Sequence, residues 1–323
     1  MKRLLFVLLL TLSLVGCGKP PEAPARRTVF AMDTVMNLAA YGEDAEAALD
    51  AAEAELRRLD ALLARGEEGS AVYAYNRGAA ADAELAALID RAEEIAAATD
   101  GAFDPYLGAA LDLWGFGSGA GEHRVPARAE LDAAAPLLDL GGIAKGLAGE
   151  SLRAVLEAYR VDGAALDLGG DVAVLGSKGD GSGWRVAVKD PAGAGAYLGV
   201  LETAGGVYAA TSGVYERYFE ENGVRYHHIL DPKTGFPADS GVVSATVVCE
   251  SGVWADALAT ACCVLGADAS LQLRERLADT VRFDLILVTE EGEALYTCDN
   301  FTPETGNGYH YRRIGGKGEQ QHG

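Results

Sequence analysis

The chain has 323 residues, of which 23% are charged, and a formal net charge of −21 at pH 7. A nucleic-acid partner would require a basic face to bind its phosphates, so this charge argues against that class of partner. An anionic substrate would have to be held by a local device, such as a metal ion or the N-terminus of a helix.

The first residues predict export. Lys2 and Arg3 precede an apolar run over residues 4–15, which is shorter than the roughly 20 residues that cross a bilayer. This pattern predicts a signal peptide over residues 1–16. The boundary Leu14-Val15-Gly16-Cys17 resembles a bacterial lipobox, which implies cleavage before Cys17 and lipid on its sulfur. The alternative is an ordinary signal peptide followed by a chance cysteine.

The predicted organisation is therefore an extracytoplasmic lipoprotein of the cell membrane, lipid-anchored at Cys17. Residues 17–27 contain three prolines and no apolar periodicity, so we expect the lipidated cysteine and a tether there. No second linker interrupts residues 28–314, which we expect to form one domain. The polar, glycine-containing residues 315–323 are expected to form a disordered tail.

Apolar spacing predicts the elements of this domain. The run 29–41 predicts a first strand, and apolar residues three and four apart predict helices over 49–63 and 82–99, the second followed by a capping Gly101. Residues 101–117 are rich in aromatics and glycine and predict a shaped loop. A helix is expected after Gly142, and further helices over 254–265 and 269–277. Strands are expected at 172–176, 184–189, 197–201, 206–211, 224–230, 242–249, 283–288 and 294–297. Helices grouped early and strands grouped late favour an α+β fold with a mixed sheet over a doubly wound sheet.

Two oxygen-bearing side chains suggest a metal site. Asp256 and Thr260 lie four residues apart on a predicted helix, so their oxygens face the same way. Such a pair suits Mg²⁺, which prefers oxygen ligands and keeps positions open for phosphates. The alternative is that Asp256 only complements the dipole of the helix start. The four cysteines after Cys17 have no CxxC spacing, which argues against zinc and leaves one disulfide possible.

A glycine-rich junction suggests a phosphate site. Residues 141–146 precede a helix, where backbone N–H groups can meet phosphate oxygens and Lys145 adds a positive charge. The spacing is neither that of a Walker A loop nor GxGxxG, and a plain tight turn is the alternative.

Two adjacent histidines suggest a titratable group. His227 and His228 stand at the end of a predicted strand, in a chain with only five histidines. One of them could act as a general acid or base near neutral pH, while the other is structural, since strand neighbours face opposite sides. The following Asp231 to Gly235 is first of all a turn signal. A metal site, a phosphate cradle and a titratable group together suit cleavage of a phosphoanhydride.

In their order along the chain, these segments resemble those of the ApbE-type FAD:protein FMN transferases, formerly described as thiamine-biosynthesis lipoproteins. The matching segments are Ala31 to Thr34, Gly101 to Pro105 with Leu113 to Gly117, Asp139 to Gly146, Leu168 to Asp171, Thr211 to Gly213, His228 to Gly235 and Asp256 to Thr260. The resemblance implies an α+β roll and a Mg²⁺-dependent enzyme with FAD as substrate. A threonine hydroxyl of an exported flavoprotein, in a short threonine-containing motif, would attack the FMN phosphorus and AMP would leave.

The resemblance also implies roles for individual residues. Mg²⁺ would be held by Asp256, Thr260 and the carbonyl of Gly142. His228 would be the catalytic histidine and could help to deprotonate the acceptor threonine. FAD would be contacted by Met32, by the backbone of Ala102, Phe103 and Asp104, and by Asp139, Lys145 and Leu230. Two alternatives remain open at this point: Mg²⁺-dependent hydrolysis of FAD to FMN and AMP, and a non-catalytic lipoprotein that binds FAD.

Overall fold

A computed structural model describes residues 23–117, 121–193 and 197–315. The predicted signal peptide, Cys17 and nearly all of the predicted tail lie outside these residues. Within the described part of the chain, no helix is both long and apolar enough to span a membrane.

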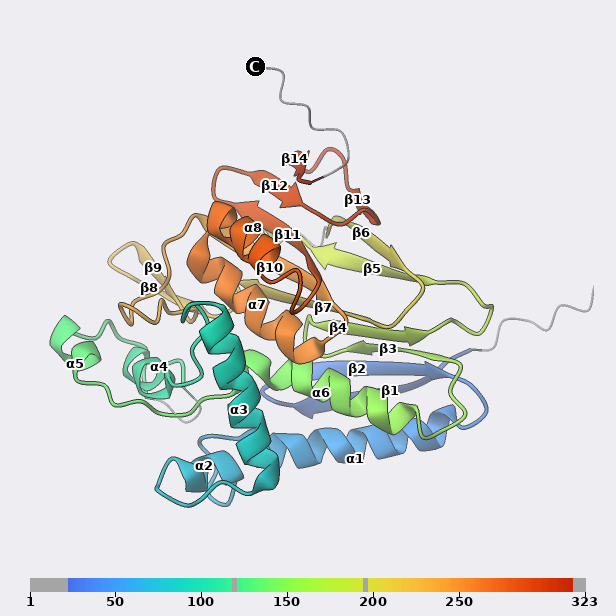
Figure 1. The fold of residues 1–323 in the computed structure, drawn as a ribbon, viewed down its shortest axis with the longest axis horizontal. Helices are drawn as coiled ribbons and strands as arrows, with labels where there is room; N and C mark the ends of the chain where they lie inside the picture. Colours follow the sequence, from blue (N-terminus) through green and yellow to red (C-terminus); the bar gives the residue numbers. More distant parts are fainter. Residues whose placement is uncertain (1–22, 118–120, 194–196, 316–323) are drawn as a thin grey trace, which may run out of the picture.

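A nine-stranded sheet forms the centre of the fold, in the order β1-β2-β3-β4-β7-β10-β11-β12-β14 (Figure 1). Its neighbouring strands are antiparallel except for β12 and β14, which run parallel. The strands are Ala25–Ala31 (β1), Thr34–Tyr41 (β2), Gly163–Asp167 (β3), Val172–Gly176 (β4), Val207–Gly213 (β7), Val242–Cys249 (β10), Phe283–Thr289 (β11), Glu293–Tyr296 (β12) and His310–Arg313 (β14).

Two layers cover the large sheet, one on each face. Alternate residues of a strand point to opposite faces, and β11 shows both environments. Leu285 and Leu287 join the main core with the helices, whereas Ile286 and Val288 join a second core under a small sheet. The helices on the first face are Ala45–Leu63 (α1), Ala83–Ala98 (α3), Gly141–Leu156 (α6), Gly252–Leu265 (α7) and Ala267–Arg276 (α8); the small sheet consists of Trp184–Lys189 (β5), Tyr197–Thr203 (β6) and Phe301–Pro303 (β13).

A third cluster, called here the aromatic cluster because it contains Trp114, Phe116, Phe219, Tyr226 and Phe236, lies beside these layers. It packs the short helix Gly108–Trp114 (α4) against a two-stranded hairpin, Tyr218–Glu221 (β8) and Val224–His227 (β9). Trp114 is fully buried there and donates a hydrogen bond from its indole nitrogen to the carbonyl of Gly235, 2.8 Å away. Two further short helices are Ala71–Tyr75 (α2) and Arg128–Asp132 (α5).

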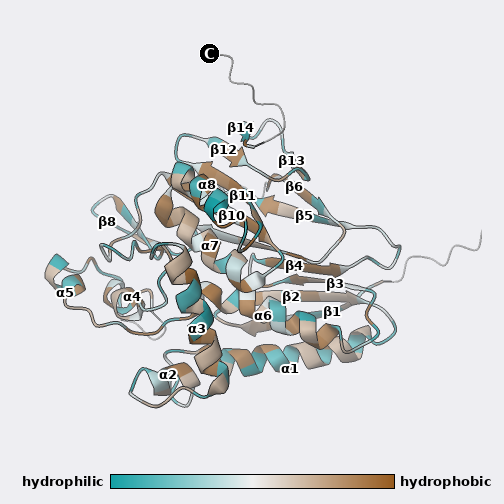
Figure 2. Cartoon of the chain, viewed as in Figure 1, coloured by the Kyte–Doolittle hydropathy of each residue, from teal (hydrophilic) through white to brown (hydrophobic). Residues whose placement is uncertain are grey.

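The hydropathy of the helices and strands follows their burial in the fold. The strands of the large sheet are mainly apolar, while α1 and α3 alternate between apolar and polar positions (Figure 2). In contrast, α7 is buried along most of its length, including Asp256. A carboxylate in that position requires a partner, because an unpaired charge is costly to bury.

The structure confirms the α+β class, with most helices in the first half of the chain, and corrects four local predictions. The expected strand 29–41 is a hairpin whose two turn residues, Met32 and Asp33, have φ of 50° and 59°. Such values are typical of a two-residue type I′ turn, which Asp tolerates without the usual glycine signal. Strand β1 begins at Ala25, inside the predicted tether, where Arg27 pairs with Asp50 and Glu46 of α1. The predicted loop 101–117 contains α4, and β9 ends at His227 rather than at residue 230.

Candidate active site

Helices α6 and α7 approach each other closely because glycines face each other at the crossing. A Cβ on Gly146 would overlap the carbonyl oxygen of Gly252, and a Cβ on Gly252 would overlap that of Gly146. This contact brings Asp256 to the amide of Gly146, which donates to Asp256 Oδ2 at 3.0 Å. In a regular helix the amide of Gly146 points toward the carbonyl of Gly142, four residues earlier. The Asp256 carboxylate, which binds this amide, therefore lies near the Gly142 carbonyl.

Lys145 joins two buried carboxylates. Its Nζ lies 3.2 Å from Asp256 Oδ1 and 3.3 Å from Asp171 Oδ2. Asp256 is 2% exposed and Asp171 5% exposed. Burial would lower the pKa of Lys145, but the charges of Asp171 and Asp256 outweigh this effect and raise it. The lysine therefore stays charged between the two carboxylates.

Asp171 is held on one side and incompletely satisfied on the other. Its Oδ1 accepts a hydrogen bond from the amide of Thr211 at 2.9 Å. Its Oδ2 has the ion-pair contact with Lys145 but no hydrogen-bond partner among the described residues. Burial, together with the charge of Asp256 and against the pull of Lys145, raises the pKa of Asp171 to about 7.

The oxygen atoms at this crossing suit a hard cation. The hydroxyl of Thr260 lies 3.1 Å from that of Ser212, at the end of β7, and one helical turn from Asp256. No cluster of three or more His, Cys, Asp or Glu side chains that could hold a metal occurs in the described part of the chain. A metal here would thus depend on one carboxylate, hydroxyls and a backbone carbonyl. Hard oxygen donors, two buried acidic side chains and a carboxylate oxygen without a hydrogen-bond partner among the described residues fit Mg²⁺.

The two histidines have different environments. Nε2 of His227 lies 3.0 Å from the carbonyl of Ala238, and its ring is buried. His228 is half-buried, and its amide donates to the carbonyl of Arg217, which also lies 3.2 Å from its Nδ1. Because a carbonyl only accepts, this contact assigns the proton to Nδ1 and leaves Nε2 as an acceptor. Burial first, and then the charge of Arg217, lower the pKa of His228 to about 3. The imidazole is therefore neutral over the physiological range.

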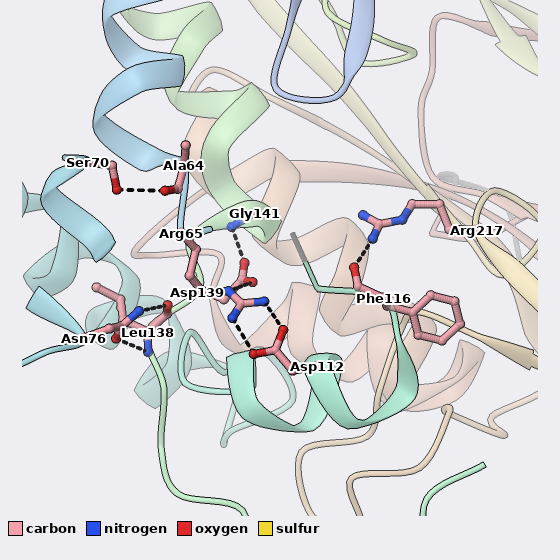
Figure 3. Close-up of polar contacts among 10 residues, drawn as sticks. All are labelled: Ala64, Arg65, Ser70, Asn76, Asp112, Phe116, Leu138, Asp139, Gly141 and Arg217. Carbon is pink, nitrogen blue, oxygen red and sulfur yellow. Dashed lines mark hydrogen bonds and ion pairs between the residues drawn. The ribbon is translucent and has the colours of Figure 1, made fainter. Parts of the chain in front are cut away.

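Asp139 is fixed from two sides (Figure 3). Its Oδ2 accepts a hydrogen bond from Nε of Arg65 at 2.8 Å, and its Oδ1 accepts one from the amide of Gly141 at 2.8 Å, at the start of α6. The same guanidinium binds both carboxylate oxygens of Asp112 on α4, at 2.8 and 2.7 Å. The backbone amide of Asp139 also donates to the carbonyl of Pro105.

The segment before Pro105 packs on the start of α6. Ala102 and Phe103 are buried, and the Phe103 ring lies where a Cβ on Gly142 would point. Asp104 turns back to accept a hydrogen bond from the amide of Tyr106 at 2.8 Å. The structure thus brings the predicted residues of 102–104 and Gly142 together.

Met32 and Leu230 lie in two segments beside the site, one next to the loop of Asp171 and one next to His228. Met32 occupies the β1–β2 turn, where its amide donates to Asp60 Oδ1 at 2.9 Å. That hairpin reaches the loop of Asp171, since a Cβ on Gly169 would overlap the Thr34 side chain. Leu230 is buried in the aromatic cluster, two residues beyond His228.

Several residues of the site were not assigned roles from the sequence. Asp171 follows a Gly-Gly pair within a recognised motif, which was a usable signal, but its pairing with Lys145 depends on the fold. Arg65 and Arg217 stand in segments without any regular pattern, and only the tertiary structure shows their partners. The four described cysteines are free and buried, so no disulfide links them.

A mixed sheet covered by helices, with a lysine, a buried carboxylate and a hydroxyl gathered at a glycine-rich helix start, has groups that suit a phosphorylated substrate. The chain belongs to the ApbE family, which it matches over residues 32–283. This finding confirms the resemblance seen in the sequence.

Individual relatives agree with this assignment. An FAD:protein FMN transferase of Treponema pallidum is 36% identical, over 71% of this chain and 74% of that protein. The crystal structure of the ApbE protein of Thermotoga maritima matches with a TM-score of 0.77 and 32% identity, over 84% of this chain and 96% of that one. The apo flavinyl transferase ApbE of Pseudomonas stutzeri matches with a TM-score of 0.74 and 29% identity, over 89% and 96% of the two chains.

Proposed function

We propose that this chain is a Mg²⁺-dependent FAD:protein FMN transferase, which moves FMN from FAD to a threonine hydroxyl of an exported flavoprotein and releases AMP. The observation that carries the proposal is the meeting of Lys145 with Asp256, at 3.2 Å, beside the hydroxyl of Thr260 on the same helix. The segments that the sequence suggested for a phosphate and for a metal thus meet, which supports a single site for both. The names of the relatives add the flavin and the protein acceptor.

The residues of α6 and α7 suit a pyrophosphate. Asp256, Thr260 and the Gly142 carbonyl would hold Mg²⁺, which would offset negative charge on the pyrophosphate. Lys145 supplies a fixed positive charge, and Asp171 and Asp256 keep its ammonium group in place. Because a half-buried lysine paired in this way cannot swing freely, its charge is preorganised for the substrate.

His228 suits the proton transfer. Its Nε2 would accept the proton of the threonine hydroxyl while the hydroxyl oxygen forms the bond to the FMN phosphorus, and the negative charge of bound FAD would raise the low pKa of the ring toward the range that this role needs. The bond between that phosphorus and the oxygen bridging to the adenylate breaks, and AMP leaves with the bonding electron pair. The carbonyl of Arg217 fixes the orientation of the ring through Nδ1.

We propose further that the protein works outside the cytoplasm, anchored to the membrane by lipid on Cys17, where its acceptor is also exported. The support is the apolar run followed by the lipobox-like Leu14 to Cys17. Metabolic labelling with a fatty acid should mark the wild-type protein and leave the Cys17→Ala variant unlabelled. Equal labelling of both would remove the anchor from the proposal.

The transferase itself is tested with soluble protein that begins after Cys17, mixed with FAD, Mg²⁺ and an acceptor domain bearing the threonine. Mass spectrometry should show an increment of one FMN on the acceptor, absent with EDTA and absent when that threonine is valine. Asp256→Asn should lose the increment, whereas Asp268→Asn, an exposed carboxylate at the start of α8, should keep it. Release of FMN and AMP without a modified acceptor would favour hydrolysis, and intact FAD would favour a binding protein.

A further inference from the structure

Arg65 connects three segments that are distant in the sequence. It follows α1, and its side chain is only 7% exposed. Three of its nitrogen atoms donate hydrogen bonds of 2.7–2.8 Å, one to Asp139 and two to Asp112. The two bonds to Asp112 form a bidentate pair, the arrangement in which arginine is most specific. Figure 3 shows the guanidinium between the two carboxylates.

One partner of Arg65 sets the start of α6. Asp139 places its other oxygen on the amide of Gly141, and Lys145 follows one turn later on the same helix. A carboxylate that lost Arg65 would be free to rotate, and it would no longer hold the first turn of α6 in one orientation.

The other partner holds the segment that leads toward His228. Asp112 lies on α4, and the carbonyl of Phe116, just beyond α4, accepts a hydrogen bond from Arg217. The carbonyl of Arg217 in turn contacts His228. These polar contacts, together with the backbone of α4 and the Arg217 residue itself, therefore join the start of α6 to His228.

Gly117 shows that the chain is shaped around this contact. A Cβ at that position would overlap both Asp112 Oδ1 and Nη2 of Arg65. A larger residue at 117 would displace the guanidinium or its partner. Close packing around a guanidinium indicates that its position, and not only its charge, matters.

We propose that Arg65 is a positioning residue for FAD binding, which holds segment 101–117, whose residues 102–104 are expected to contact FAD, against the start of α6. The proposal rests on the proposed function of this site. Lysine cannot replace arginine here, because one ammonium group cannot form the bidentate pair with Asp112 and also reach Asp139. Because groups on both segments that are expected to contact FAD would shift, the Arg65→Lys variant should bind FAD about 10-fold more weakly, which corresponds to about 1.4 kcal/mol.

The experiment compares FAD binding and turnover in four proteins. They are the wild type, Arg65→Lys, Asp112→Asn and Arg58→Lys; Arg58 lies on α1, is 46% exposed, and also bridges two carboxylates, Glu55 and Glu84. FAD affinity is measured by flavin fluorescence, and kcat and KM for FAD by transfer to the acceptor. Thermal unfolding checks that each variant is folded.

The expected result is a rise of about 10-fold in the Kd and KM for FAD in Arg65→Lys, with kcat at saturating FAD within about threefold of the wild type. Asp112→Asn should show the same pattern to a smaller degree, and it serves as the test if Arg65→Lys does not fold. Arg58→Lys should match the wild type. Unchanged Kd and KM in folded Arg65→Lys would overturn the proposal, as would a fall in kcat alone, because that result would place Arg65 at the reacting groups. If the wild type bound FAD but transferred no FMN, the proposed function would fail, while the comparison of FAD affinities would still test Arg65.

Discussion

The contact between Gly146 and Gly252 offers a direct test of how the site is assembled. In Gly146→Ala, the new Cβ would lie 2.1 Å from the carbonyl oxygen of Gly252, where ordinary contacts begin near 3.4 Å. The obstacle is backbone, which cannot rotate away as a side chain could. Helices α6 and α7 would have to separate by more than about 1 Å, which would stretch the 3.0 Å bond from the Gly146 amide to Asp256.

The expected change in the free energy of unfolding is the sum of two destabilising effects and one stabilising effect. Overpacking typically costs about 1–3 kcal/mol, and loss of a hydrogen bond to a charged group about 1.5–3 kcal/mol. The greater helix propensity of alanine would return about 1 kcal/mol. The sum predicts that Gly146→Ala is less stable than the wild type by roughly 3 kcal/mol.

Urea unfolding followed by tryptophan fluorescence measures this difference. Gly149→Ala is the matched control, since it lies on the same helix and gains the same propensity. Its Cβ would meet the Tyr208 ring at 2.9 Å and the Leu168 side chain at 3.3 Å, which are side chains that can shift. We expect a change within about 1 kcal/mol for the control. If Gly146→Ala were as stable as Gly149→Ala, the close approach of the two helices would not be what places Asp256.

Three further predictions concern single groups. Lys145→Met leaves two buried carboxylates without their cation and should lower the free energy of unfolding by about 3–5 kcal/mol. Lys189→Met, which removes an exposed ion pair with Glu216, should lower it by less than about 1 kcal/mol. Similar values for the two variants would contradict the role of Lys145. The pKa of His228 is lowered from 6.5 to about 3 in the folded protein, so below pH 6.5 the unfolded state binds more protons than the folded state. This histidine should therefore make the protein less stable at pH 5 than at pH 8, by about 2 kcal/mol. His228→Gln should therefore lose about that much less stability than the wild type over the same range in urea titrations, and an identical pH dependence would refute the shift. Burial raises the pKa values of the four described cysteines, Cys249, Cys262, Cys263 and Cys298. A thiol reagent should therefore label these four only after denaturation. Rapid labelling of any of them in the native protein would contradict their burial.

The sequence by itself determined the elements whose residues repeat at a regular spacing. Strand β10 was expected at exactly its observed residues, and α1, α3 and α7 within a few residues of their ends. Asp256 and Thr260 could be placed on one helix face because helical geometry depends only on local spacing. The turn at Met32 and Asp33 was missed, since its positive φ values have no glycine to announce them.

Only the tertiary structure decided which of these groups meet. Lys145 and Asp256 are separated by 111 residues, and they come into contact because two glycines allow α6 and α7 to approach. The partners of Asp171 and Arg65 depend in the same way on segments that pack from distant parts of the chain. Local spacing records which face of an element a side chain occupies, but the packing of that face against another element determines its partner, and this packing is where the chemistry of the site arises.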